Sequence, residues 1–513
     1  MPWQPDFIDA LKATSITPIY ELEIVRANYG VGAPRKIQSD YGKLRVNKAT
    51  IRGTSVTPNR WAVSFGGFEI SLVGDIRPYK RNLMRGCIAI LRVKLKGLTN
   101  KERIGIGQLD SISGQRGRYV AKFKDIISAF QSRIDYRGNT SFEVSKLFYE
   151  TVVQTTVATS WSPSSTSLVV ADSSGFNKSS AHAGLLYCTP PSGGGDPFYM
   201  RWSSKNDSTN TFTLTSGTAS HPSTASASTL GAGSVIQNAV RINAAPHALF
   251  AQVITSTGAG TNGIRDVLPD SYGTGFPLPH SFVDMADAQQ TTDFIVGQGG
   301  VTYAWDYTTV APLDSGFRSL MDTFSAVGQW PVIRQNSFTW RGCFDPTGKY
   351  GTQPLTQATI SDNDIIEVYS VDFFDPSLKA VYSRSSMVYD VSGSTYVDAT
   401  NNFPRSIPVA GQISRNFGTY YDPAYNESAM AQGDVQRMKI WDFYNWTRLS
   451  MRVHLKYAVL CAGDKIEITS AYLVDSYTDD DKTYVKRQAM ILEIGYNLDD
   501  RSCDIVVGVP PVL

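Results

Sequence analysis

The sequence of 513 residues is poor in charge and lacks long apolar runs. Only 18% of its residues are charged and the net charge is +2, so we expect no general attraction to nucleic acid or to an anionic membrane surface. No run of about 18 apolar residues occurs, as a membrane-spanning helix requires, and residues 1–20 lack the basic and apolar parts of a signal peptide. These absences predict a protein without stable membrane association.

Cysteine is also scarce, with five residues in the whole chain. The closest two, Cys461 and Cys503, are 42 residues apart and no CxxC pair occurs, which argues against a zinc knuckle or a redox motif. An odd and sparse set fits assembly in a reducing cytosol. We expect each cysteine to be a buried small apolar side chain: Cys87, Cys188, Cys343, Cys461 and Cys503.

The residue types that enzymes use are present but dispersed. The sequence has no HxH or HExxH pair, no GxSxG elbow and no Walker loop, and neither Gly105-Ile106-Gly107 nor Gly273-Thr274-Gly275 is a GxGxxG after a strand. The acids Asp479–Asp481 are consecutive and lack the central glycine of a calcium loop. We therefore predict that the protein is not an enzyme and has no catalytic, cofactor-binding or metal-binding residues. The dispersed histidines are His182, His221, His247, His280 and His454, the last on the polar side of a predicted strand.

Charge is distributed unevenly along the chain. Residues 1–150 contain 25 Lys and Arg against 13 Asp and Glu, whereas the remainder contains 23 against 33. The asymmetry has two readings: two solvated faces of opposite sign, or a basic channel lining or subunit contact. Under the second reading, glutamates at Arg92, Lys94 and Lys96 are expected to impair assembly.

Gly (42), Pro (25) and Tyr (26) are abundant, and this composition favours turn-rich β structure. About six apolar alternations of period two in the first 125 residues predict a small antiparallel barrel or sandwich. Gly66-Gly67 is either a hairpin turn or a bend within one strand. Short helices are expected at residues 6–13 and after Asp125. The expected strands are Tyr20–Ile24, Trp61–Phe65, Phe68–Leu72, Leu91–Leu95, Ile104–Ile112 and Tyr119–Phe123.

The segment from 157 to about 233 is rich in Ser, Thr, Gly and Ala and almost uncharged. Its short apolar runs recur at strand-and-turn spacing, so we predict a compact all-β insertion in place of a disordered linker. The runs are Leu168–Val170, Leu185–Tyr187, Phe198–Met200 and Thr211–Leu214.

The middle of the chain, residues 239–355, is predicted as an ordered connector followed by an α+β unit. Apolar residues at helical spacing predict a helix from Asp314 to Val327, ended by Gly328. A β pair, Trp330–Ile333 and Ser337–Trp340, is expected around Gln335-Asn336.

The C-terminal part contains the longest alternation. Met451 to Val459 alternate with polar residues, Gly463-Asp464 interrupt the pattern, and Lys465–Thr469 resume it, which predicts a hairpin. The aromatic cluster Trp441–Trp446 is either a carbohydrate-stacking patch or, as we favour, buried against a barrel. Further predicted elements are strands at Ile365–Val371, Tyr472–Val474, Ala489–Asn497 and Asp504–Val509, a strand pair within Ala380–Val397 and a long helix at Glu427–Arg448.

The order of these elements resembles a known family. The text GQLDSI, a glycine turn, YVAKF and a helix at 107–130 are similar to the first β domain of phage hub and distal-tail proteins. The stretch at 256–277, with STG, TNG, DVLP and YGTGFP, is similar to minor tail proteins, and the helix–strand–strand unit at 314–340 to tail-tip hubs. The strand–turn–strand at 448–469 completes the resemblance to tail hub or tail-tip baseplate proteins of long-tailed bacteriophages and gene transfer agents.

The resemblance implies a mainly β fold with some α, an α+β chain of antiparallel β-barrel or sandwich hub domains plus a small all-β insertion. It implies an N-terminal barrel-like domain at 1–156, the insertion at 157–238, the connector and α+β unit at 239–355, and a C-terminal barrel with one long helix at 356–513. The implied role is structural, in the virion at the tail tip, after synthesis in the host cytoplasm.

By the same resemblance, three copies form a ring joining the distal tail tube to a central spike or fibre protein. The ring meets the end of the tape-measure protein and opens for DNA passage during host cell entry. Three alternatives stay open: a distal tail ring protein of six copies, a host glycan-binding adhesin acting through the insertion, and a cell-wall hydrolase. A hydrolase would clear peptidoglycan on a zymogram, where we expect a negative gel.

Overall fold

The computed structural model describes a large part of the chain, and the statements below concern that part. The described residues are 3–26, 35–38, 42–57, 62–79, 83, 85–125, 154–176, 185–191, 197–215, 228–244, 247–248, 283–296, 305–309, 328–335, 337–346, 348, 353–372, 384–388, 396–400, 414–419, 441, 446–474 and 483–510.

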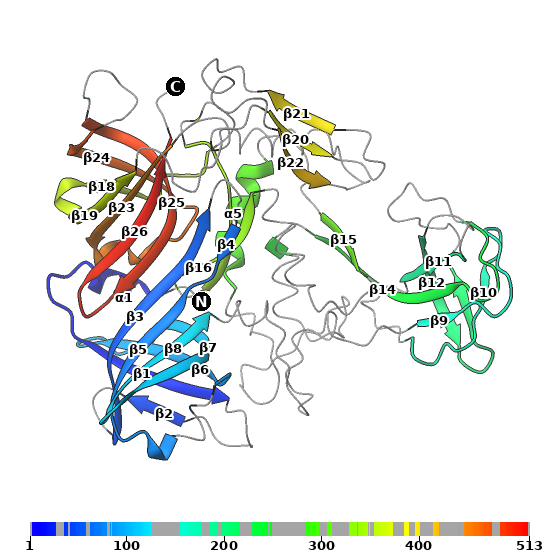
Figure 1. Cartoon of the computed structure of the whole chain (residues 1–513), viewed down its shortest axis with the longest axis horizontal. Helices are drawn as coiled ribbons and strands as arrows, with labels where there is room; N and C mark the ends of the chain where they lie inside the picture. The colour runs from blue at the N-terminus through cyan, green and yellow to red at the C-terminus, as the bar shows by residue number, and fades with distance from the viewer. Residues whose placement is uncertain are drawn as a thin grey trace.

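The protein is mainly β, and a 14-stranded sheet forms its body (Figure 1). The first part of this sheet runs β3-β5-β8-β7-β6-β1-β2, with antiparallel neighbours, and β2 also lies against β3. The strands therefore curl into the predicted N-terminal barrel. Its elements are α1 (Pro5–Ala10), β1 (Pro18–Arg26), β2 (Arg35–Gln38), β3 (Leu44–Thr57), β4 (Ala62–Ser64), β5 (Gly67–Gly74), η1 (Arg77–Tyr79), β6 (Ile88–Leu95), β7 (Glu102–Gln115) and β8 (Arg118–Asp125).

Two features of this barrel go beyond the sequence-based expectation. β4 and β5 both pair with β3 in one continuous register, from Ser55↔Ser64 to Ile51↔Phe68. Gly66-Gly67 is thus a bend within one strand line and the hairpin alternative is wrong. The long strand β3, which the sequence analysis did not identify, occupies the place opposite that line.

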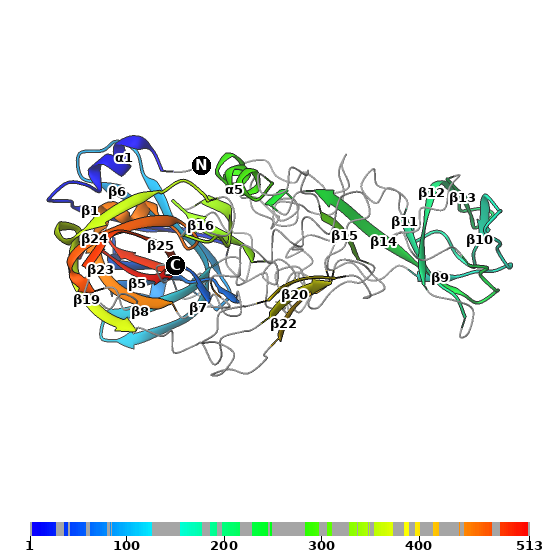
Figure 2. The same cartoon turned by 90° about the horizontal axis from the view of Figure 1, so that it is seen from above.

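The second part of the sheet forms the C-terminal barrel (Figure 2). β18 pairs in parallel with β24, and β19, which follows after a single 3-10 turn, pairs with β23. The segment Ala358–Asp372 therefore bonds to two strands and closes the circuit. The elements are β18 (Ala358–Ser361), η3 (Asp362–Asp364), β19 (Ile365–Asp372), β23 (Thr447–His454), η4 (Leu455–Val459), β24 (Lys465–Val474), β25 (Thr483–Asn497) and β26 (Ser502–Val509).

The predicted hairpin at 448–469 is wrong. β23 ends at His454, and η4 follows in place of a continued strand. β23 pairs with β19 and β26, whereas β24 pairs with β18 and β25. The 3-10 helix η4 also buries every second side chain here: Leu455 and Tyr457 are buried and Lys456 is exposed. The apolar–polar alternation of these residues therefore does not require a strand. Thr447 and Arg448 lie in β23, so the predicted helix does not extend to Arg448.

The two barrels are joined edge to edge. β3 pairs with β25, and one apolar core cluster runs through both barrels. The Tyr20 hydroxyl donates a hydrogen bond to Asp499 Oδ2 over 2.9 Å, which ties β1 to the β25–β26 turn. A sheet therefore crosses from residues 1–156 into 356–513, while the domain boundaries themselves stay predictions.

The insertion forms a separate seven-stranded sheet with its own apolar core. All four predicted apolar runs are strands or strand ends, as expected. In both views it lies apart from the barrels (Figures 1 and 2). Its strands are β9 (Gln154–Thr156), β10 (Ser167–Val169), β11 (Leu185–Thr189), β12 (Phe198–Asn206), β13 (Thr211–Leu214) and β14 (Val235–Ala244), joined by β15 (Trp305–Thr309).

The remaining described elements are a helix and two small sheets. β16 (Gln329–Arg334) and β17 (Ser337–Gly342) form the predicted β pair, and α5 (Met285–Val296) packs on β17. β20 (Arg384–Val388) pairs with β21 (Tyr396–Thr400), as predicted, and with β22 (Ser414–Thr419). Of the helix predicted at 427–448, Trp441 is helical, Trp446 lies outside helix and strand, and Thr447 and Arg448 lie in β23. The rest of that helix, the predicted helices at 126–130 and 314–327, and the acids at 479–481 lie outside the described residues.

Candidate functional site

The clearest built feature is a buried joint that holds α5 and the β16–β17 hairpin against the C-terminal barrel. Arg341 on β17 lies 2.8 Å from Asp287 Oδ2 on α5, and its Nε donates to Asp464 Oδ1 before β24 over 2.9 Å. Arg334 pairs with the other oxygen of Asp287 and donates to Val459 O. Two cations and two anions from four chain segments thus neutralise one another in a largely buried place.

The electrostatics of the joint agree with this pairing. Burial alone raises the pKa of Asp287, but Arg341 and Arg334 outweigh it and lower that pKa below its usual value. Asp287 Oδ2 also accepts a hydrogen bond from Thr339 Oγ1 over 2.7 Å, and Asp464 Oδ2 accepts one from Cys461 N over 2.9 Å. Since every charge here has a partner, the joint is suited to holding parts together.

A glycine makes the close approach in the joint possible. Gly463 has φ +96, and a Cβ there would lie 2.7 Å from Arg341 Cβ and 3.1 Å from Trp330 Cζ2. The sequence analysis identified Gly463-Asp464 as a turn but did not connect it with Arg341. No short-range signal could do so, because Arg341 and Asp464 are 123 residues apart.

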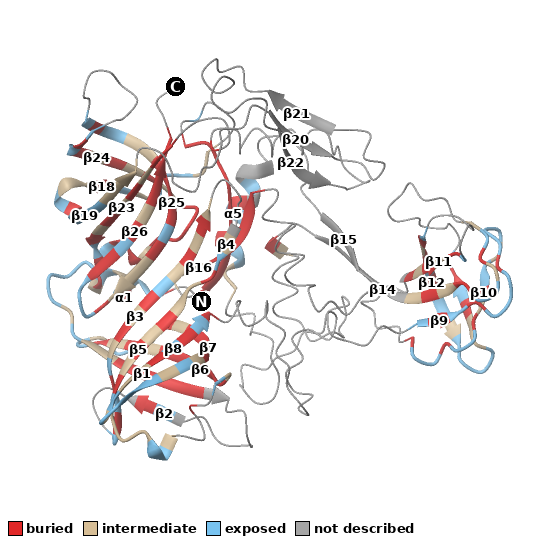
Figure 3. Ribbon diagram, viewed as in Figure 1, coloured by how far each residue is buried: buried red, intermediate tan, exposed pale blue. Residues whose placement is uncertain are grey.

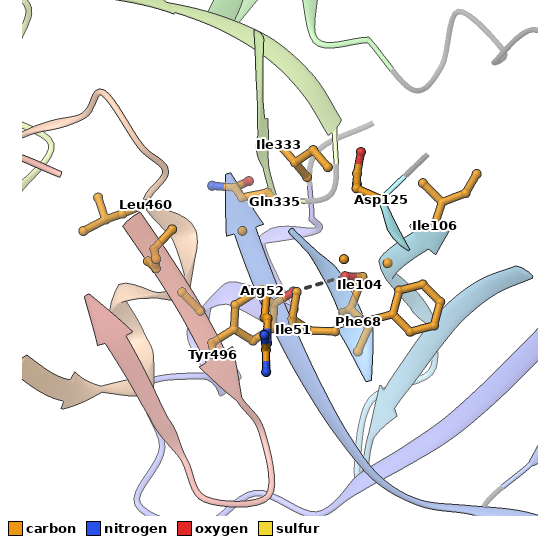
Figure 4. Close-up of a pocket in the computed structure, with 15 residues that line it drawn as sticks. Ile51, Arg52, Phe68, Ile104, Ile106, Asp125, Ile333, Gln335, Leu460 and Tyr496 are labelled. Carbon is orange, nitrogen blue, oxygen red and sulfur yellow. Dashed lines mark hydrogen bonds between the residues drawn. The ribbon is translucent and has the colours of Figure 1, made fainter. Parts of the chain in front are cut away.

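Beside the joint lies a small cavity between the two barrels and the hairpin turn (Figure 4). Phe68, Tyr496 and Ile333 contribute to its apolar lining, and Gln335 and Asp125 to its polar lining. Its volume is about 40 Å³, enough for a few water molecules. This space is far smaller than the pockets that hold substrates or cofactors.

The C-terminal barrel has an exposed apolar edge at β19. Only β23 pairs with β19 among the described strands, and Ile366, Val368 and Tyr369 are exposed along it. The Tyr369 hydroxyl donates to Asp504 Oδ1 over 2.8 Å; burial and this hydrogen bond raise the pKa of Tyr369 to about 12. A strand with one described strand partner and exposed apolar side chains is a surface on which another chain can pair.

The corner that presents this edge is fixed by hydrogen bonds. Asp364 Oδ2 accepts from Ser361 N over 3.0 Å and from Ser361 Oγ over 2.8 Å, which caps η3. Lys456 on η4 pairs with Asp364 Oδ1. Desolvation opposes ionisation, but these partners lower the pKa of Asp364 to about 2.

A second exposed apolar group lies on the distal parts of β24 and β25. Tyr472 is 84% exposed and Val485 is 72% exposed, while Leu473 and Tyr484 between them are buried. We call Ile366, Val368, Tyr369, Tyr472, Val474 and Val485 the apolar surface of the C-terminal barrel.

The N-terminal barrel uses part of its excess basic charge internally. Glu21 on β1 is buried between Lys101 Nζ at 2.7 Å and Lys36 Nζ at 3.5 Å, and Arg92 Nε lies 3.3 Å from Glu23 Oε2. Arg92 therefore neutralises a buried acid. Lys94 is half-buried and Lys96 is exposed, so of the three predicted basic residues these two are placed to meet a partner.

The other residues singled out from the sequence take structural positions. Trp441 and Trp446 are fully buried with ring centroids 5.4 Å apart, which confirms their burial against the barrel. All five cysteines are buried, as predicted, and none of them forms a disulfide bond. His454 is exposed, and burial lowers the pKa of His247. His182, His221 and His280 lie outside the described residues.

Among the described residues there is no cluster of three side chains that could hold a metal ion. No helix in this part of the chain is long and apolar enough to span a membrane.

No family model and no curated protein matches the chain. Solved structures to which it is similar include tail proteins. A tail protein from Neisseria meningitidis MC58 is 9% identical, with 96% of each chain covered and a TM-score of 0.36. The 43 kDa tail protein of prophage MuSo2 from Shewanella oneidensis is 10% identical, with 96% of this chain and 98% of that chain covered and a TM-score of 0.34.

A third similar structure is the prophage tail protein gp18 from Listeria monocytogenes EGD-e, which is 10% identical, with 96% of this chain and 94% of that chain covered and a TM-score of 0.30. Identities and TM-scores of this size do not carry a functional argument, which has to come from the geometry of this chain.

Proposed function

We propose that this protein is a structural component of a phage-type tail and that it assembles through the apolar surface of its C-terminal barrel. The observation that carries the proposal is the exposed edge β19 with Ile366, Val368 and Tyr369. A monomer in water would leave this edge open to uncontrolled pairing. Closed symmetry covers such edges, because each copy supplies the surface that the next copy needs.

The ring we propose is a tail hub of three copies. Each chain carries two barrels bonded through β3 and β25, so three copies would place six barrels around one axis. The hub would join the distal tail tube to a central spike or fibre protein, contact the end of the tape-measure protein and open for DNA passage at the tail tip. This role works by shape and contact, and it includes no bond-making step.

The test measures the mass of the purified protein and of two matched variants. A trimer has three times the chain mass of 56.3 kDa, whereas six times that mass would favour the distal tail ring. Val368→Lys places a charge on the open edge, and we expect at least a tenfold weaker association. Val73→Lys is the control, since Val73 in the N-terminal barrel is 42% exposed and Val368 is 40% exposed. A monomeric wild type at micromolar concentration, or equal effects of the two lysines, would contradict the proposal.

A further inference from the structure

One face of the insertion carries a row of side chains that the assembly role does not use. The strand register aligns Gln154 on β9 with Gln237 on β14, Gln237 with Tyr187 on β11, and Tyr187 with Tyr199 on β12. The four residues therefore stand in one line across four adjacent strands. We call them the Tyr–Gln row.

The row lies on the outer face of this sheet. Side chains alternate between the two faces of a strand, and the neighbours of the row along each strand, Leu186, Cys188, Phe198 and Ile236, are fully buried in the core of the insertion. Figure 3 shows this change between buried and more exposed residues along β11 and β12. Gln154 is exposed, and the other three members of the row are half-buried.

The chemistry of the row combines flat rings with amides. The Tyr187 and Tyr199 rings have centroids 5.0 Å apart at an interplanar angle of 50°, so they form a shallow aromatic strip. Tyrosine presents an apolar face and a polar tip. Each glutamine adds two N–H donors and a carbonyl acceptor. Together they suit a partner with apolar C–H faces and many hydroxyl groups.

Two observations favour a neutral carbohydrate over a protein. The exposed large apolar side chains of the described residues all lie outside the insertion, in the barrels, at Met285 on α5 and at Leu355, so the row does not belong to a larger exposed apolar patch of the kind that marks protein interfaces. The row itself is uncharged, and Lys205 farther along β12 is held by Asp207 at 2.7 Å and by Ser173 O at 2.9 Å. Arg201, which is exposed two residues after Tyr199, can donate further hydrogen bonds to hydroxyls.

We propose that the Tyr–Gln row is a binding site for a neutral polysaccharide, whose sugar rings stack on Tyr187 and Tyr199 and whose hydroxyls bond to Gln237 and Gln154. The position of the insertion, apart from the barrels (Figure 1), leaves this site clear of the apolar surface used for assembly. In the proposed ring, the insertion would bind a glycan while the C-terminal barrels make the contacts between copies.

The test uses the full-length protein in native gels that contain a soluble α-glucan, β-glucan, mannan or galactan, with alginate as an anionic comparison. We expect retardation by at least one neutral polymer. Tyr187→Ala and Gln237→Ala should each weaken it at least fivefold, and Tyr187→Phe should keep most of it because the ring remains. Thr211→Ala on β13, outside the row, is the matched control and should bind like the wild type.

Several results would overturn the proposal. No retardation by any of the four neutral polymers would do so, as would retardation by alginate alone. Equal binding by wild type, Tyr187→Ala and Gln237→Ala would place the site elsewhere. Because alanine at Tyr187 removes packing, loss of binding by Tyr187→Ala counts as evidence only if its melting curve equals that of the wild type. If the curve differs, Gln154→Ala at the exposed end of the row provides the second measurement of binding. A mass equal to that of the wild type separates this result from a failure of assembly.

Discussion

The two barrels share one sheet and one core but present different surfaces to their surroundings. In the N-terminal barrel, β2 lies against β3, the acids of β1 are covered by Lys and Arg, and Val73 is its one exposed large apolar side chain among the described residues. The C-terminal barrel exposes the six side chains of its apolar surface and the strand β19, which has one partner among the described strands. The comparison teaches that similar architecture can present different surfaces, and it supports the proposal that copies associate through the second barrel.

The largest expected effect comes from breaking the buried joint. Arg341→Leu would leave Asp287 and Asp464 with a missing partner in a buried place, and we expect a loss of about 3–5 kcal/mol in the free energy of unfolding. Urea unfolding followed by tryptophan fluorescence measures it, because Trp330 and Trp340 lie beside the joint. The control is Arg77→Ala in the N-terminal barrel, which removes an exposed pair with Asp75 and should leave the midpoint unchanged. Equal midpoints for both variants would contradict a stabilising joint.

A pair of glycines separates backbone strain from packing. Gly97 and Gly463 have φ +98 and +96, but a Cβ at Gly97 meets nothing within 4 Å whereas one at Gly463 meets Arg341. We expect Gly97→Ala to cost about 1–2 kcal/mol from strain alone and Gly463→Ala to cost a further ~1–3 kcal/mol from overpacking. The same unfolding measurement compares them. A Gly97→Ala variant as unstable as Gly463→Ala would show that packing at the joint adds nothing.

The basic residues of the first barrel can be sorted by single substitutions. Arg92→Glu would oppose the nearly buried Glu23, and we expect a loss of about 1–3 kcal/mol in stability. Lys96→Glu should leave stability unchanged because Lys96 is exposed. If Lys96→Glu nevertheless weakens assembly in the mass measurement, the basic face meets a partner. Normal assembly of Lys96→Glu together with Lys94→Glu would favour the alternative of a solvated face.

The smallest effect is an opposite pH dependence of the two barrels. The pKa of Asp364 is lowered to about 2, below its unfolded value of about 3.9, so its stabilisation is present above pH 4 and is lost as pH falls towards 2. Burial raises the pKa of Glu102 in the first barrel, so protonation of Glu102 favours the fold as pH falls. Hydrogen exchange of peptides from β18–β19 and from β7, between pH 6 and 3, reads the two separately. Asp364→Asn should reduce the pH dependence of protection in the β18–β19 peptides, and Glu102→Gln should reduce it in the β7 peptides. An unchanged pH dependence of protection in both variants would contradict the assignment.

Much of the secondary structure could be predicted from the sequence, because side-chain alternation is a local property. The strands at Tyr20–Ile24, Leu91–Leu95 and Tyr119–Phe123 and the four runs of the insertion were all found. The candidate sites were harder. The joint requires Asp287, Arg334, Arg341 and Asp464 from distant segments, and the Tyr–Gln row requires the register of four strands. No short window of sequence contains a pattern that would predict either the joint or the Tyr–Gln row.

The sequence by itself determined that this is a turn-rich β protein with an almost uncharged β insertion and with buried cysteines. These properties follow from composition and from which side chains avoid water. Only the tertiary structure decided that β23 pairs with β26 in place of β24, that β3 bonds to β25, and that β19 pairs with β23 alone among the described strands. Alternation specifies which face of a strand is buried, whereas the partner of a strand is chosen by hydrogen bonds and packing between residues far apart in the chain.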